Sequence, residues 1–159
     1  MLRSHNNWFH GINLSPWLMM CSSSVELAFL ITVAIKLRFV TVEHAPVRTA
    51  ISLVKHIKRV LQVYYRAGFT VRYVMMDGEF EKVKELLPTI VCNTTAAKEH
   101  IAEAKRKIIV VKERNRGVVN TLLFTYIPRR MKIEFIYFVT LWLNAFPVKC
   151  VVSETFSPR

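Results

Sequence analysis

The stretch VRYVMMDGEFEKV, residues 71–83, decides how the fold is interpreted, because it contains the only aspartate of the chain, Asp77. The residues before Asp77 are largely β-branched, aromatic or apolar, which predicts a strand, and Gly78 follows directly. An Asp-Gly pair is common in turns, since glycine tolerates a positive φ. An aspartate at the carboxyl end of a strand is also a typical ligand position in open α/β sheets. The surrounding sequence must therefore distinguish a turn from a metal site.

The composition predicts one basic globular domain. The chain has 159 residues, enough to bury a core without disulfides or structural metals. Its 23 Lys and Arg residues exceed its 11 Asp and Glu residues, which gives a net charge of +12. A field of this sign attracts polyanions, so DNA or another nucleic acid, or an acidic membrane surface, is the expected kind of partner. No motif for a small-molecule substrate is present.

The cysteines and histidines predict no metal cluster. Cys21, Cys92 and Cys150 are odd in number, far apart and free of any C-x-x-C spacing. The five histidines form no H-E-x-x-H motif and have no paired cysteines at zinc spacing. We therefore expect a protein of a reducing compartment, cytoplasmic or nuclear rather than secreted.

Two apolar stretches resemble membrane segments only in part. Residues 27–35 are too short to span a bilayer, and residues 135–148 are interrupted by Asn144 and Pro147. The start of the chain lacks a continuous apolar core of the signal-peptide type. A membrane partner is thus not expected, although a small membrane-associated basic protein anchored by residues 131–152 remains an alternative.

Periodicity predicts alternating strands and helices. Residues 26–34 and 37–44 are expected to form an antiparallel hairpin, and residues 49–66 a helix stopped by Gly68. A strand over 69–76, a short helix over 79–87 and a strand over 89–93 follow. A long helix is expected from about Thr95 to Arg116, closed by Gly117, and a last helix after Pro128.

This order predicts an α/β domain with a mixed, ribonuclease H-like sheet flanked by helices. Residues 1–24 show no clear periodicity and are expected to be a lead-in, in part disordered, that precedes the fold. The folded domain is then residues 25–159.

Three motifs carry a resemblance to a known family. They are D-G-E-F at 77–80, K-E-R-N-R-G at 112–117, and W-L-N-A-F-P at 142–147 with S-P-R at 157–159. Together they resemble the integrase catalytic core of copia-type LTR retrotransposon polyproteins, over roughly residues 25–159. The match is to part of such a polyprotein, without the upstream zinc module, so the chain is interpreted as a truncated fragment of an old element.

The resemblance implies a ribonuclease H-like domain that joins element DNA to a target by means of three carboxylates and two Mg²⁺ ions. Two such cations about 4 Å apart need several anionic oxygens around them. Asp77 matches the second carboxylate of the family, so it is interpreted as the remnant of a metal site. The first carboxylate would fall near Met20 and the third at Lys105, where neither residue can serve.

These replacements predict a degenerate site that holds no magnesium here. An ammonium group at Lys105 turns an attraction for Mg²⁺ into a repulsion. Glu103 lies two residues earlier, about 200° around a helix, so it is expected to point elsewhere. The alternative is an active magnesium-dependent integrase or nuclease in which Asp77 works with Glu79 and Glu103.

The long helix is the expected nucleic-acid surface. Six basic residues are the candidates for phosphate contacts: Lys98, Lys105, Arg106, Lys112, Arg114 and Arg116. No base-reading motif is evident, so binding without sequence preference is expected. The sequence leaves open the oligomeric state and whether the protein is made in the cell.

Overall fold

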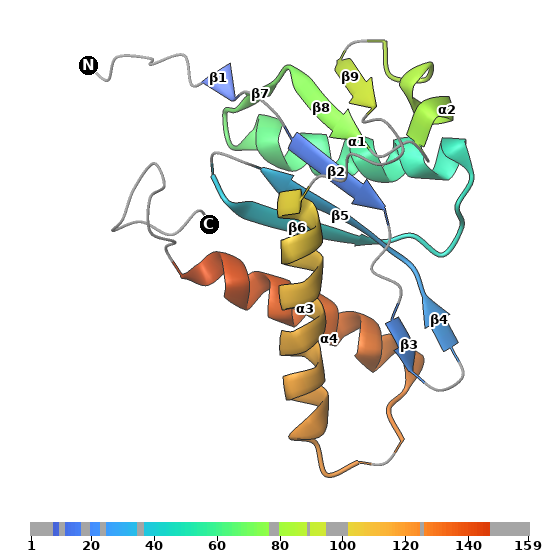
Figure 1. Ribbon diagram of the computed structural model, residues 1–159, viewed down its shortest axis with the longest axis vertical. Helices are drawn as coiled ribbons and strands as arrows, with labels where there is room; N and C mark the ends of the chain where they lie inside the picture. Colours follow the sequence, from blue (N-terminus) through green and yellow to red (C-terminus); the bar gives the residue numbers. More distant parts are fainter. Residues whose placement is uncertain are drawn as a thin grey trace.

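A computed structural model describes residues 8–9, 12–16, 20–22, 25–34, 37–76, 80–88, 90–94, 102–124 and 126–146. Its strands are β1 (Trp8–Phe9), β2 (Ile12–Pro16), β3 (Met20–Ser22), β4 (Val25–Leu27), β5 (Phe29–Ala34), β6 (Phe39–His44), β7 (Thr70–Val71), β8 (Tyr73–Met76) and β9 (Val91–Thr94). Its helices are α1 (Ala50–Arg66), α2 (Glu81–Lys84), α3 (Ala102–Asn120) and α4 (Arg129–Ala145). Figure 1 shows α3 and α4 crossing below the main sheet, with α1 and α2 in the upper part of the view.

The main sheet has five strands in the order β6-β5-β2-β8-β9. Strand β5 is antiparallel to both β6 and β2, whereas β8 is parallel to both β2 and β9. Two small ribbons accompany it, β1 with β7 and β3 with β4. This is the mixed α/β, ribonuclease H-like sheet flanked by helices that the sequence predicts.

The start of the sheet differs from the prediction. The sequence predicts a fold that begins after residue 24, but β2 lies at the centre of the sheet, between β5 and β8. Leu14 pairs with Thr32 on one side and with Met76 on the other. The sequence does not reveal this strand because Ile12–Pro16 is short and contains Asn13, Ser15 and Pro16, so its local pattern is weak and its partners are distant in sequence.

The first hairpin and first helix are confirmed. Strands β5 and β6 pair in antiparallel register, and the hydroxyl groups of Thr32 and Thr41 meet across them. Helix α1 begins after Thr49, whose Oγ1 accepts a hydrogen bond from the Ser52 backbone N–H. It ends before Gly68, which has φ +81, a conformation that favours glycine.

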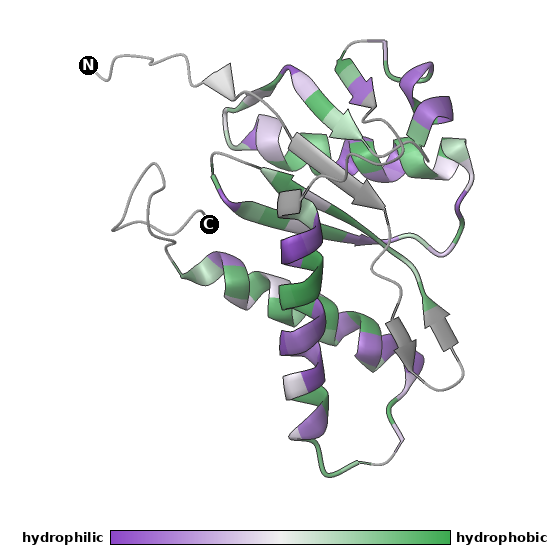
Figure 2. Cartoon of the chain, viewed as in Figure 1, coloured by the Kyte–Doolittle hydropathy of each residue, from purple (hydrophilic) through white to green (hydrophobic). Residues whose placement is uncertain are grey.

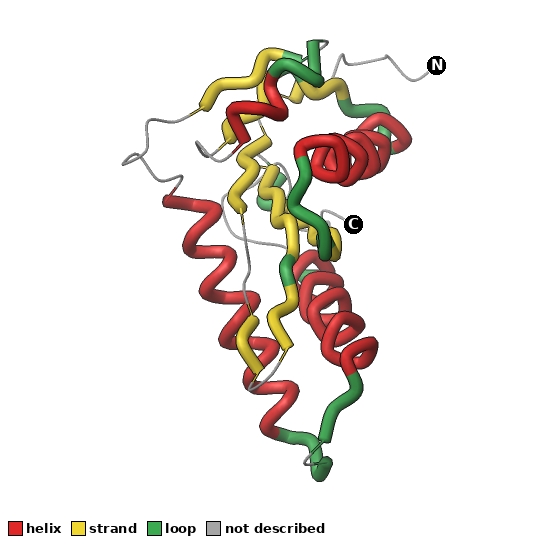
Figure 3. The backbone as a smooth tube through the Cα atoms, turned by 90° about the vertical axis from the view of Figure 1, so that its right-hand side faces the viewer, coloured by secondary structure: helices red, strands yellow, loops and turns green. Residues whose placement is uncertain are grey.

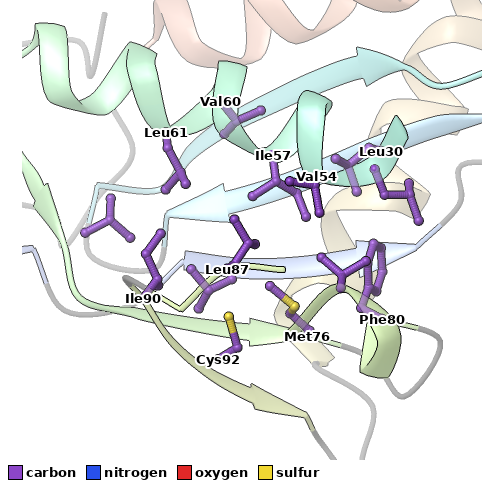
Figure 4. Packing of buried hydrophobic residues seen from close by; sticks show 14 of the residues in the cluster. Leu30, Val54, Ile57, Val60, Leu61, Met76, Phe80, Leu87, Ile90 and Cys92 are labelled. Atoms are coloured by element: carbon purple, nitrogen blue, oxygen red, sulfur yellow. The ribbon is translucent and has the colours of Figure 1, made fainter. Parts of the chain in front are cut away.

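Two apolar clusters hold the layers together, one on each side of the sheet. The first joins α1 and α2 to the sheet and includes Leu30, Ile57, Met76 and Phe80, shown close up in Figure 4. The second joins α3 and α4 to residues such as Phe29, Ile31 and Val42. In Figure 3 the strands run between the helices. Neighbouring residues of β5 enter opposite clusters, as the two-residue period of a strand requires.

Helix α3 extends beyond the predicted end. The sequence predicts that Gly117 closes it, but the helix continues to Asn120 and Gly117 lies inside it, with open space where a Cβ would be. The predicted beginning, from Thr95 to Ile101, lies outside the described residues.

Helix α4 covers the outer edge of β6. The Tyr137 hydroxyl accepts a hydrogen bond from the His44 backbone N–H at 3.0 Å, and the Asn144 side chain bonds to the backbone of Val40. An exposed edge strand can pair with another chain. The side chains of Tyr137 and Asn144 bond to this edge of β6 and so shield it. Within the described part of the chain, no helix combines the length and apolarity needed to cross a bilayer.

Candidate metal centre and nucleic-acid surface

The one aspartate of the chain comes at the end of a strand next to the sheet centre. Asp77 follows Met76, the last residue of β8, but Asp77 to Glu79 lie outside the described residues. Strands β2, β8 and β9 are parallel, so their carboxyl ends lie at the same end of the sheet. Open α/β sheets bind ligands at the carboxyl ends of their strands.

The first of the two other expected carboxylates would come from a strand beside β8. Strand β8 pairs with β2 and β9, and neither of their sequences, INLSP and VCNT, contains Asp or Glu. Met20, the position expected for this carboxylate, lies instead in β3, where it pairs with Leu27 of β4. Met20 is therefore not on the strand beside β8, whereas Asn13 of β2 is, in register with Met75.

The third expected position lies on α3. Lys105 is exposed, one residue after the buried Ala104, so its ammonium group stands on the solvent side of the helix. Glu103 lies in the first turn of α3, and Glu113 is exposed near its other end. In the described ranges no three His, Cys, Asp or Glu side chains gather where they could hold a metal ion.

The outer side of α3 carries the predicted basic surface. Lys105, Arg106, Arg114 and Arg116 are exposed and Lys112 is half-buried, whereas Lys98 lies outside the described residues. Lys105, Lys112 and Arg116 are spaced i, i+7 and i+11, which places them within about 40° on one line of the helix. We call these three residues the α3 basic line. Figure 2 shows α3 as largely hydrophilic.

Besides the α3 basic line, the structure brings together two cations, Lys107 and Arg38, whose proximity is not evident from the sequence. Lys107 of α3 is half-buried, and burial together with the neighbouring Arg38 guanidinium holds the pKa of Lys107 below its usual range. Arg38 lies in the tight turn before β6, with φ +55. The sequence signal is faint, because two residues almost 70 positions apart meet only once α3 packs on β5.

At the carboxyl end of β6, Glu43 and His44 lie near further titratable side chains. Glu43 Oε2 lies 3.6 Å from His56 Nδ1 and 4.0 Å from an Arg59 guanidinium nitrogen, both on α1. On the opposite side of the strand, the ring of His44 packs on Phe29 with centroids 5.3 Å apart. Its Nε2 is buried and has no hydrogen-bond partner among the described residues. Burial, then Arg129 and His56, lower the pKa of His44, which favours the neutral imidazole.

No known protein-family model and no curated protein matches this sequence. Solved structures do match its fold. A chain from the structure of the simian T-cell lymphotropic virus intasome in complex with PP2A regulatory subunit B56 gamma aligns with 97% of this chain at a TM-score of 0.72 and 10% identity. The chain spans only 55% of that protein's length.

Two isolated catalytic cores align over nearly their whole length. The HTLV-2 integrase catalytic core domain, solved in complex with magnesium, matches 95% of this chain and 94% of its own at a TM-score of 0.68 and 10% identity. The BIV integrase catalytic core domain matches 94% of this chain and 91% of its own, with a TM-score of 0.62 and 14% identity. At such identities the likeness is one of fold. The five-stranded mixed sheet with its flanking helices is therefore the ribonuclease H-like fold of retroviral integrase catalytic cores.

Proposed function

We propose that this chain is a degenerate integrase core of copia-type retrotransposon origin that binds nucleic acid and does not catalyse strand transfer. The observation that carries the proposal is the basic outer side of α3, on a fold shared with integrase cores. The motifs D-G-E-F, K-E-R-N-R-G and W-L-N-A-F-P support the retrotransposon origin.

The proposed loss of catalysis follows from the charges around the expected metal centre. Two Mg²⁺ ions that clamp an in-line phosphoryl transfer need several carboxylate oxygens. Strand β2 supplies no carboxylate, and the cation Lys105 stands where the family has a glutamate. On the strand beside β8 the position closest in chemistry to the missing carboxylate is Asn13, whose amide has the shape of a carboxylate without its charge.

Binding would be electrostatic. The α3 basic line offers three cations on one side of the helix, and Arg106, about 100° away, and Arg114, about 180° away, bring the number on α3 to five. If all five make contacts, affinity for a duplex falls on the order of a hundredfold or more between about 50 and about 200 mM salt. Lys107 of α3 and the neighbouring Arg38, in the turn before β6, add positive potential beside the same helix.

The first experiment measures binding of a labelled duplex to the purified chain at two salt concentrations. The test variant is Lys105→Gln with Lys112→Gln and Arg116→Gln, which removes the α3 basic line. The control, Lys55→Gln with Lys58→Gln and Arg66→Gln, removes three exposed charges from α1. Selective loss in the test variant supports the proposal, whereas equal losses would show attraction by net charge alone.

The alternative, an active enzyme, is tested by strand transfer with Mg²⁺. We expect no turnover. Magnesium-dependent turnover that Asp77→Asn abolishes would overturn the proposed loss of catalysis. The proposed lost positions can be tested in reverse, because Asn13→Asp with Lys105→Glu is expected to raise affinity for Mg²⁺, measured by calorimetry.

A further inference from the structure

The connection between α3 and α4 carries exposed apolar side chains. Leu123 is 99% exposed, Phe124 63% and Tyr126 80%. Together they present on the order of 400–500 Å² of side-chain surface, comparable with the largest apolar patch of a typical monomer. In Figure 1 this connection lies at the lower end of the view, away from the main sheet, and Figure 2 colours its lowest part as apolar. We call Leu123, Phe124 and Tyr126 the apolar tip.

Hydrogen bonds hold the start of the connection to the end of α3, so the apolar tip is exposed on an ordered segment. The Thr121 hydroxyl donates to the Val118 carbonyl at 2.7 Å, and the Leu122 N–H donates to the Val119 carbonyl at 3.2 Å. Leu122 and Ile127, which flank the apolar tip, are half-buried. The chain thus covers part of one apolar residue on each side and leaves the three residues of the tip in water.

Exposed arginines flank the apolar tip on both sides in the sequence. Arg129 and Arg130 are the first two residues of α4 and are exposed, and Arg116 is exposed one turn before the end of α3. The first turn of α4 contains no acidic residue. Cations at a helix N-terminus add to the positive end of the helix dipole, so this region favours an anionic partner.

An anionic lipid surface satisfies both features at once. A nucleic acid would pair with the arginines but would leave Leu123 without an apolar environment, and a second copy of this +12 chain would bring like charges together. A bilayer accepts apolar side chains at the boundary between headgroups and acyl chains, while arginines remain among acidic headgroups. We propose that the apolar tip, with Arg129 and Arg130, binds peripherally to membranes that contain anionic lipid.

The test is co-sedimentation of the full chain with vesicles of phosphatidylcholine, with and without phosphatidylserine. We expect binding only when phosphatidylserine is present. Leu123→Ser with Phe124→Ser should weaken it at least tenfold, because the inserted apolar area is lost. Arg129→Gln with Arg130→Gln should weaken it by roughly twenty- to thirtyfold, since each arginine near an anionic surface contributes about fivefold.

Two control variants separate insertion from general adhesion. Ile51→Ser removes an apolar side chain that is 79% exposed on α1, and Lys55→Gln with Lys58→Gln removes two charges there. Both should bind vesicles like the original chain. The proposal is overturned if the original chain ignores the vesicles, or if the α1 charge variant loses as much binding as the tip variants. It is also overturned if Leu123→Ser with Phe124→Ser abolishes a concentration-dependent dimer and leaves vesicle binding intact.

Discussion

The side chain of Asn144 forms two hydrogen bonds with the backbone of Val40, 104 residues earlier. Its Oδ1 accepts from the Val40 N–H at 2.9 Å, and its Nδ2 donates to the Val40 carbonyl at 2.7 Å. Both hydrogen bonds are buried, and the amide imitates the neighbouring strand that β6 lacks at the edge of the sheet. This gives a structural reason for the asparagine in the W-L-N-A-F-P motif.

We expect Asn144→Ala to lower the free energy of unfolding by about 2–4 kcal/mol, because it leaves a buried N–H and a buried carbonyl of Val40 without partners. Urea denaturation followed by circular dichroism measures the change. Thr140→Val is the matched control on the same helix, since the Thr140 hydroxyl bonds locally, to the Ile136 carbonyl. A loss of less than about 1 kcal/mol in Asn144→Ala would show that the edge of β6 does not need the amide.

Gly117 offers a stabilising substitution. It lies inside α3 with nothing within 4 Å of the position that a Cβ would take, so Gly117→Ala should raise the free energy of unfolding by about 0.5–1 kcal/mol. Gly68→Ala should have the opposite effect, because φ at Gly68 is +81. Thermal unfolding of both variants checks the pair, and a destabilised Gly117→Ala would mean that α3 does not continue through this residue.

Stability should fall in mild acid because of His44. Its folded-state pKa lies below the ordinary value of 6.5, so the unfolded chain binds the proton more readily. The contribution of His44 is therefore complete above about pH 6.5 and is lost as the pH falls through the lower, folded pKa. The charges of Arg129 and His56 oppose the charging of the imidazole, while Glu43 on the other side of the strand pairs with α1.

The measurement is the free energy of unfolding between about pH 7.5 and about pH 5. His44→Gln should flatten the decrease, since the amide does not titrate. His56→Gln should retain most of it. Equal slopes in the original chain and in His44→Gln would assign the acid sensitivity to other groups.

Lys107 should contribute to DNA affinity although the sequence alone does not single it out. Replacing it by Gln should make the plot of log affinity against log salt shallower by about one if Lys107 contacts a phosphate. Lys55→Gln on α1 should leave the slope unchanged. An unchanged slope in Lys107→Gln would restrict the contact surface to the exposed cations.

Elements whose signal is local can be predicted from the sequence. The apolar spacing of residues 50–66 and the cap at Thr49 are sufficient for α1, and β-branched runs are sufficient for the β5 and β6 hairpin. Strand β2 cannot be predicted in this way, because its stability comes from partners 18 and 62 residues away, as Leu14 shows with Thr32 and Met76. The same holds for the candidate site. Exposed lysines and arginines of α3 follow from helical spacing, but the meeting of Arg38 with Lys107 depends on packing.

The position of β2 has a consequence for translation. Since β2 separates β5 from β8, the strand pairing of the two halves of the main sheet runs through β2, the first strand of that sheet to leave the ribosome. That strand must wait until β8 has been synthesised before its second edge is paired. Initiation at Met19 or Met20 would therefore produce a polypeptide with all the described helices and both outer parts of the sheet, in which the apolar cluster under α1 would have to hold β5 and β8 together without the strand between them.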